Sequence, residues 1–164
     1  MEHDFSLRLA QSIVLCGLAS WMSLAVFNNI IDRGTNSTLL HRMLSMSLLK
    51  ADPELGEGLK GRAIDRKETS ALLLRLVIVV QVLISILMIV GATLFVLGVL
   101  NRSPQDYERG VSAATFGLSV FGSLWFFFLC GGLYFGYWMK MPQVQQVHLS
   151  LVIITLLSLI FLRM

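Results

Sequence analysis

Long stretches without a charged residue alternate with polar connections along this chain. All 13 Lys and Arg residues and all 10 Asp and Glu residues lie outside four such stretches. A helix needs about 20 apolar residues to cross the hydrocarbon core of a bilayer. Each stretch reaches that length, so the pattern predicts four transmembrane spans. They cover about residues 9–31, 76–101, 110–139 and 142–162.

Backbone groups inside a bilayer must form their hydrogen bonds within the protein, so each span is predicted to be an α-helix. The links after the second and third spans are short, at residues 101–109 and 140–142. Short links make consecutive helices antiparallel neighbours. We therefore expect an all-α membrane protein with an up-down-up-down bundle of four transmembrane helices, in a single membrane domain over residues 1–164.

The connection between the first two spans, residues 32–75, is the extended polar loop of the chain. Asp32, Thr35 and Asn36 follow the pair Asn28–Asn29 and form a cluster that ends one helix and caps the next. Apolar residues then recur at helical spacing. This spacing predicts a short amphipathic helix that lies on the membrane or against a partner. Its apolar residues are Leu39, Leu40, Met43, Leu44, Met46 and Leu48.

The composition excludes a water-soluble globular protein, because hydrophobic residues make up 55% of the chain and charged residues 14%. The formal net charge of +3 arises mostly between the spans, where it reports membrane orientation rather than nucleic-acid binding. The long loop and Lys140 together carry nine Lys and Arg residues, against four on the face that holds both termini. The positive-inside rule thus favours a cytoplasmic 32–75 loop.

The third span is rich in small residues at four-residue spacing. Gly117 belongs to one such series, and Gly132 and Gly136 form another. Small residues let membrane helices approach closely, which is where these helices gain packing energy. We expect this span to be the packing hub. The alternative is that glycine is simply common in membrane spans.

Few residues of the spans are of the types that bind ligands or take part in catalysis. His148 and Gln81 are the weak candidates for contact with a bound lipid or quinone. Haem bound by two histidines needs axial ligands at similar depth, which these spans do not supply. Asp32, His41 and Asp52 show no spacing typical of a metal site or an acid–base pair. We expect no intrinsic cofactor, no metal site and no enzymatic activity.

The residues that close the first span form the most specific motif of the chain. Residues 21–36 contain the pattern N-N-x-x-D-x-x-x-N from Asn28 to Asn36, and Leu44-Ser45-Met46 follows. This run resembles a bacterial family of predicted small integral membrane proteins of unknown function. The resemblance implies a four-helix fold in the bacterial cytoplasmic membrane and assigns no reaction. This chain departs from the family pattern at Leu133, where an acidic residue is expected.

Two classes of function stay open at the level of the sequence. The leading hypothesis is a non-catalytic accessory or structural subunit of a larger bacterial membrane complex, respiratory or photosynthetic, that acts through helix packing. The alternative is a stand-alone lipid- or small-molecule-binding protein with a polar pocket near the end of the first span. A transporter or enzyme is less favoured, because the spans lack charged groups. The predicted partner or packing residues are Asn28, Asn29, Asp32, Asn36, Gly117, Gly132 and Gly136.

Overall fold

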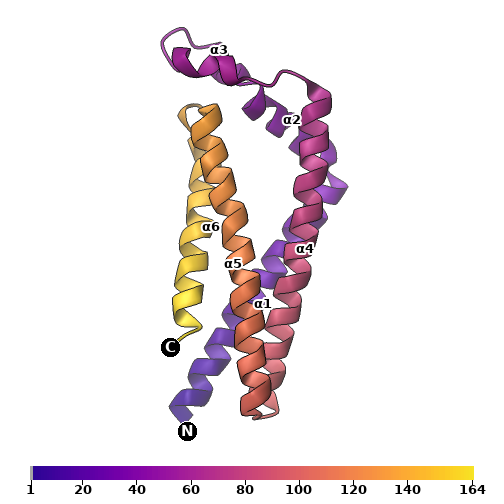
Figure 1. Ribbon diagram of the computed structural model, residues 1–164, viewed down its shortest axis with the longest axis vertical. Coiled ribbons are helices and arrows are strands. Elements are labelled where there is room, and N and C mark those ends of the chain that lie inside the picture. The colour runs from indigo at the N-terminus through magenta and orange to yellow at the C-terminus, as the bar shows by residue number, and fades with distance from the viewer. Residues whose placement is uncertain (1) are drawn as a thin grey trace.

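The structure, a computed structural model, describes residues 2–164, with side chains from residue 5 onward, and Figure 1 shows its helices. Four long helices make up most of it: α1 (Glu2–Ile31), α4 (Lys67–Leu100), α5 (Pro104–Phe135) and α6 (Pro142–Phe161). Shorter helices lie in the connections: α2 (Arg33–Leu44), α3 (Ser47–Lys50), and the 3₁₀ turns η1 (Glu57–Arg62) and η2 (Tyr137–Met139).

All four long helices contain a segment long and apolar enough to cross a membrane. The predicted all-α fold with four membrane-length helices is therefore confirmed for the described residues, and the protein is an integral, multi-pass membrane protein. The helices extend beyond the charge-free stretches. α4 begins at Lys67, well before Leu76, because backbone hydrogen bonding continues past the ionised side chain of Arg75.

The third long helix ends earlier than residue 139. α5 stops at Phe135 because Gly136 has a left-handed φ of +63°, a conformation that glycine adopts at little steric cost. The chain then turns through η2 into α6. Gly136 also makes room for the first loop, since a Cβ there would lie 3.1 Å from side-chain atoms of Leu49 and Leu59. This glycine therefore shapes a turn within the chain.

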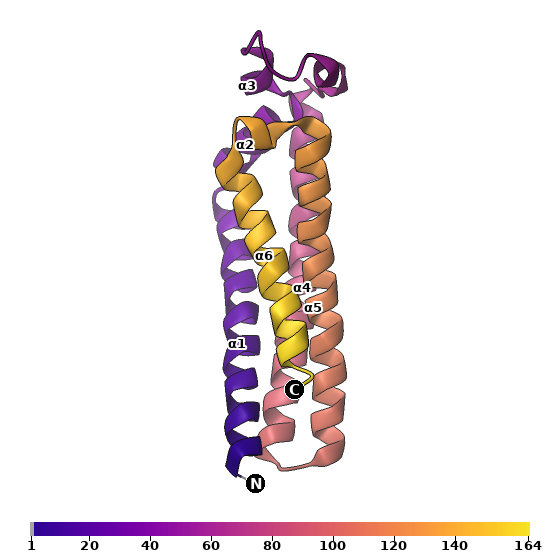
Figure 2. The same ribbon diagram turned by 90° about the vertical axis from the view of Figure 1, so that its left-hand side faces the viewer.

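The long helices pack in sequence order. α4 packs on both α1 and α5, and α6 packs mainly on α5. Figures 1 and 2 show neighbouring helices running in opposite directions, with the α4–α5 turn at one end and the α5–α6 turn at the other. α1 and α6 make few contacts with each other. The bundle is therefore open between its first and last helices.

Glycines bring α4 and α5 close together. A Cβ at Gly98 would lie 2.5 Å from the backbone nitrogen of Tyr107, and a Cβ at Gly110 would overlap the backbone of Phe95. A Cβ at Gly117 would lie 3.3 Å from a carbonyl oxygen of α4. Of the small residues predicted to make the third span a packing hub, Gly117 thus packs against α4 of the same chain. Lipid is as apolar as these side chains, so close packing rather than water exclusion stabilises the contact.

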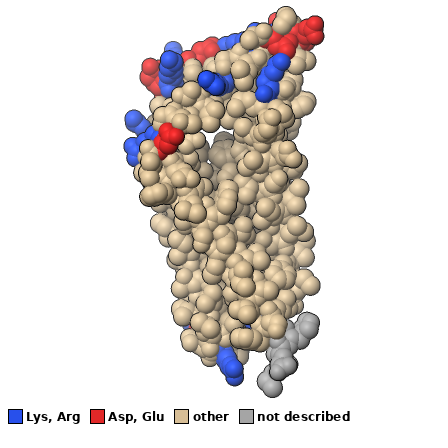
Figure 3. Space-filling model, turned by 180° about the vertical axis from the view of Figure 1, so that it is seen from behind, with Lys and Arg blue, Asp and Glu red and all other residues tan. Residues whose placement is uncertain are grey.

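Residues 33–62 cover the end of the bundle where α1 stops (Figure 1). We call these residues the cap. The apolar residues predicted to form one helix are divided between α2 and α3, because Met46 has a left-handed φ of 53°. Leu44, Met46 and Leu49 are buried within the protein, so the apolar side of the cap is turned toward the bundle. Figure 3 shows charged side chains gathered at this capped end.

Candidate functional site

The motif that closes α1 builds a hydrogen-bonded corner between three helices. Asp32 Oδ1 accepts a hydrogen bond from the backbone nitrogen of Thr35 at 3.1 Å and so caps α2. Asn36 Nδ2 donates to Asn29 Oδ1 at 2.9 Å, and Asn29 Nδ2 donates to Gln81 Oε1 of α4 at 2.6 Å. We call Asn29, Asp32, Asn36 and Gln81 the polar corner.

The polar corner connects α1, α2 and α4 through groups that satisfy one another. Gln81 is only 4% exposed, and a buried amide requires a hydrogen-bond partner, which Asn29 supplies. Asn28 is exposed and its side chain lies outside this network. Mutual satisfaction favours helix docking, rather than ligand binding, as the role of the corner.

Two further polar pairs join α4 to its neighbours. His41 Nδ1 of α2 lies 3.2 Å from Oγ of Ser70, a fully buried residue. Ser23 Oγ of α1 lies 2.9 Å from Ser85 Oγ. Together with the polar corner, these pairs fix α4 against α1 and α2 through hydrogen bonds, which hold the register of helices whose apolar faces alone would slide.

His148 of α6 lies in an aromatic cluster against α5. Its ring stacks on Trp125, with centroids 5.8 Å apart and planes 26° apart, and the Phe128 ring lies 5.0 Å away. The Tyr137 hydroxyl donates to the Phe128 carbonyl at 2.7 Å and lies 3.4 Å from His148 Nδ1. A hydroxyl has one proton, so this geometry assigns Nδ1 as a donor and Nε2 as an acceptor. We call these four residues the histidine cluster.

Two polar atoms near the histidine cluster are buried without a hydrogen-bond partner among the described residues. One is Nε1 of Trp125 and the other is Oε1 of Gln145. The Gln145 amide reaches inward because Gly132 lacks a side chain, and a Cβ at Gly132 would overlap it. Its Nε2 donates to the Leu129 carbonyl at 3.3 Å. Gly132 therefore makes room for an amide of α6.

Two polar contacts hold the cap on the α5–α6 turn. Lys140 Nζ forms an ion pair with Asp52 Oδ2, and this hydrogen bond lowers the pKa of the Asp52 carboxyl below its ordinary value. The Arg62 guanidinium donates to the Tyr134 carbonyl at 3.1 Å and lies 5.0 Å from the centre of the Tyr134 ring. Residues far apart in the sequence thus fasten the cap to the bundle.

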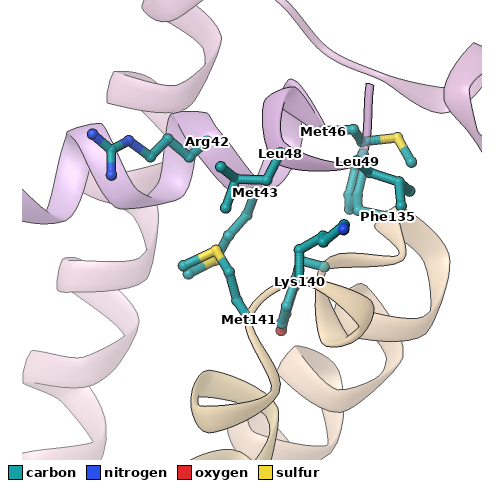
Figure 4. Close-up of a pocket in the computed structure, with 9 residues that line it drawn as sticks. Arg42, Met43, Met46, Leu48, Leu49, Phe135, Lys140 and Met141 are labelled. Atoms are coloured by element: carbon teal, nitrogen blue, oxygen red, sulfur yellow. The ribbon is translucent and has the colours of Figure 1, made fainter. Parts of the chain in front are cut away.

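Apolar side chains fill the space between the cap and this turn. Met43 and Met46 of the cap meet Phe135 and Met141, as Figure 4 shows. The remaining cavity holds about 10 Å³, which is room for about one water molecule. This region is a packed interface, and its cavity is too small for a ligand larger than a water molecule.

Two grooves open on the sides of the bundle. The α1–α4 groove has a volume of about 630 Å³ and is almost entirely apolar, with Cys16, Ser20 and Thr93 among its lining residues. The α1–α6 groove has a volume of about 420 Å³. Figure 3 shows the surface hollowed below the charged end. The α1–α6 groove is lined by Trp21, Gln143, Gln146, Val147, Ser150 and Leu151.

The predicted site residues therefore do not form one site but lie in separate parts of the bundle. Gln81 joins the motif residues in the polar corner, whereas His148 lies apart in the histidine cluster, so the two candidates for ligand contact do not meet. Within the described residues, no three His, Cys, Asp or Glu side chains lie together as a metal site would require. The predicted glycines all have packing roles inside the chain, at α4 for Gly117 and at the capped end for Gly132 and Gly136.

Sequence reasoning missed Trp125 and Tyr137 as partners of His148, and it missed Ser20 and Thr93 as surface residues of a groove. In a span where nearly every position is apolar, hydrophobic periodicity does not distinguish the inward from the outward face. The sequence offered only a weaker signal than periodicity. A polar side chain within a span either forms a hydrogen bond to another part of the protein or has a functional role.

Comparison with known proteins places the chain in a family. Residues 7–164 match the family model described as "Predicted small integral membrane protein (DUF2165)". No curated protein and no solved structure matches the chain. The match covers nearly the whole sequence, agrees with the four membrane-length helices, and indicates no catalytic family. The chain therefore belongs to this family of small integral membrane proteins.

Proposed function

We propose that this protein is a non-catalytic accessory subunit of a larger membrane complex, and that a transmembrane helix of its partner packs in the α1–α4 groove. One observation carries the proposal. Ser20 of α1 and Thr93 of α4 both line this groove and are exposed, and neither hydroxyl forms a hydrogen bond within the described residues. A hydroxyl left unpaired in hydrocarbon is unfavourable, and a partner helix can supply the missing hydrogen bond.

Several other hydroxyls of the long helices differ in this respect. Each of these bonds to the carbonyl of the residue four positions earlier in its own helix, which satisfies it without a partner. They include Ser12, Thr115, Ser119, Ser123, Thr155 and Ser158. Ser112 and Ser150 are also exposed and form no hydrogen bond within the described residues. What distinguishes Ser20 and Thr93 is that they line one apolar groove from its two walls.

The shape of the α1–α4 groove also suits a helix. Cys16 and Ala19 of α1 and Ala92 of α4, which line the groove, have small side chains. Small residues on both walls allow a third helix to approach closely. An acyl chain would fill the same apolar space, but it carries no group that bonds to the hydroxyls of Ser20 and Thr93. A helix with a polar side chain or an accessible carbonyl does.

The alternative of a ligand pocket around Asn28, Asn29 and Asp32 receives less support. Asn29 and Asp32 already bond to protein groups, and Asn28 is exposed outside the network. A ligand there would have to compete with hydrogen bonds that the chain already makes. We infer that this motif orients the cap on the bundle.

The proposal also includes a location and an orientation. We propose the bacterial cytoplasmic membrane, with the cap in the cytoplasm. The support is the excess of Lys and Arg residues at the capped end, where the 32–75 loop and Lys140 lie.

Affinity purification from the native membrane tests the proposed function. Tagged protein at its native expression level is extracted in mild detergent, and chains that co-purify are quantified by mass spectrometry. Ser20→Leu/Thr93→Leu fills the groove and removes both hydroxyls. Ser119→Leu/Ser123→Leu is the matched control, because these serines are exposed on α5 and bond within their own helix.

The expected result is a stoichiometric membrane partner with the wild-type protein and with the control variant, and its loss with the groove variant. Both variants should remain folded, because all four positions are exposed. A wild-type protein that purifies without any stoichiometric partner, or a partner that stays bound to the groove variant, would contradict the proposal.

A further inference from the structure

We propose that the capped end of the bundle binds anionic phospholipid through exposed arginine and lysine side chains of α2 and of the first turns of α4. This inference goes beyond the proposed subunit role, because it concerns another surface and requires no partner chain. It rests on which cations lack partners within the protein, on where they lie relative to the membrane, and on the charges around them.

The basic side chains of the capped end fall into two groups. One group bonds to carboxylates or to a backbone carbonyl of the chain, and its members are Lys50, Lys60, Arg62 and Lys140. The other group is exposed, and its side chains form no ion pair or hydrogen bond within the described residues. We call this second group the unpaired cations, and its members are Arg33, Arg42, Arg66, Lys67 and Arg75.

The unpaired cations lie around the contact between α2 and α4. Arg33 is the first residue of α2, and Figure 4 shows Arg42, near the end of α2, extending away from the packed interface with the α5–α6 turn. Arg75 lies on α4 between Ser70, which meets α2, and Gln81 of the polar corner. The remaining two cations stand at the start of α4. The packing of α2 on α4 thus gathers these charges at one end of the bundle.

Arg75 lies at the edge of the hydrocarbon core. It directly precedes the charge-free stretch of α4, and Leu72, Leu76 and Val79 beside it are each more than half exposed. Exposed apolar side chains on a membrane helix contact lipid, so the Arg75 guanidinium lies among lipid-facing positions. An ionised side chain at such a position extends to the headgroups, where phosphate oxygens accept its hydrogen bonds.

The charges around the unpaired cations favour an anionic lipid. Residues 32–44 and 66–75 contain five cations but only two carboxylates, those of Asp32 and Glu68. A zwitterionic headgroup carries its own cation, whereas an anionic phospholipid supplies the negative charge that this surface lacks. The acyl chains of a lipid also pack on the exposed apolar side chains of α4, which free phosphate cannot do.

Native mass spectrometry of the purified full-length protein in mild detergent tests this proposal. Phosphatidylglycerol and phosphatidylcholine with the same acyl chains are titrated separately, and the fraction of protein with bound lipid gives each affinity. We expect phosphatidylglycerol to bind at least about tenfold more tightly than phosphatidylcholine, because each cation near a membrane surface strengthens binding of anionic lipid several-fold. Inorganic phosphate at the same concentration as the lipid should not displace phosphatidylglycerol.

Two double variants separate the unpaired cations from total charge. Arg33→Gln/Arg75→Gln should weaken phosphatidylglycerol binding about tenfold and leave phosphatidylcholine binding unchanged. Arg33→Lys/Arg75→Lys keeps the charge and should recover part of the loss. Lys50→Gln/Arg109→Gln is the matched control and should bind like the wild-type protein, because it removes two exposed cations that already pair within the chain.

Three results would overturn the proposal. They are equal affinity of the wild-type protein for the two lipids, equal loss of phosphatidylglycerol binding from the two glutamine variants, and displacement of phosphatidylglycerol by inorganic phosphate. The measurements use the isolated chain, so their outcome is independent of whether a partner helix occupies the α1–α4 groove.

Discussion

Asn28 and Asn29 are adjacent in the sequence, but only Asn29 belongs to the polar corner. Asn29→Ala would leave the Gln81 side-chain carbonyl without its partner and would remove one of the two acceptors of the Asn36 amide. Because Gln81 is buried, we expect the free energy of unfolding to fall by about 1–3 kcal/mol. Unfolding of the purified protein in detergent micelles measures this change.

Asn28→Ala is the matched control for this prediction, because Asn28 is exposed and outside the network. Its effect should stay within about 0.5 kcal/mol. Equal losses of stability from the two alanine variants would show that the hydrogen bonds of the polar corner contribute nothing specific.

At the scale of the helices, α5 carries glycines in contrasting surroundings. A Cβ at Gly110 would overlap the backbone of Phe95, whereas a Cβ at Gly131 would meet no atom within 4 Å. We expect Gly110→Ala to separate α4 from α5 and to destabilise the protein by about 1–3 kcal/mol. Gly131→Ala should be neutral or stabilise it by up to about 1 kcal/mol, since alanine favours helix. Thermal unfolding of both variants checks this, and a tolerated Gly110→Ala would contradict the close α4–α5 contact.

We expect the attachment of the cap to depend on pH, because the ion pair between Asp52 and Lys140 helps to hold it on the bundle. The pKa of Asp52 is lower in the folded cap than its ordinary value of 3.8, mainly because of the hydrogen bond from Lys140. The ion pair therefore contributes fully above the unfolded-state pKa and is lost as the pH falls through the lowered pKa. Asp52→Asn removes the charge at every pH but keeps an oxygen that can cap the turn at Glu54 and Leu55.

Hydrogen exchange of the cap measures this dependence. At neutral pH we expect faster amide exchange over residues 47–62 in Asp52→Asn than in the wild-type protein. The difference should disappear at a pH below the lowered pKa of Asp52. Asp65→Asn is the control, because Asp65 pairs with Lys50 and does not contact the α5–α6 turn. A difference that persists unchanged at low pH would exclude the ion pair as its cause.

Sequence patterns predicted the existence of the long helices better than their ends and faces. Absence of charge identifies a span, because an ionised side chain is costly in hydrocarbon. The end of α5 depends on the left-handed conformation of Gly136, and the division of the cap depends on that of Met46. The absence of charge that identifies a span encodes neither conformation. The polar corner was predicted as a helix end from its asparagines and aspartate, but Gln81 joins it from α4 through a contact that no local pattern encodes.

For the whole molecule, the distribution of charge predicts the orientation in the membrane. Lys and Arg residues concentrate at the capped end, so we expect the cap in the cytoplasm and both termini outside. A cysteine introduced at exposed Lys67, in a variant without the native cysteines, should react with a membrane-impermeant maleimide only after the membrane is opened. Labelling of this cysteine in intact cells would show the opposite orientation, with the cap outside the cytoplasm.

The proposed subunit role of the whole molecule requires a partner helix in the α1–α4 groove. A photo-crosslinking amino acid at position 20, in native membranes, tests that claim most directly, with position 119 on the exposed face of α5 as its control. We predict a crosslink from position 20 to one membrane protein, and no crosslink to that protein from position 119. Adducts with lipid alone at position 20, or the same protein adduct from both positions, would contradict a partner helix in this groove.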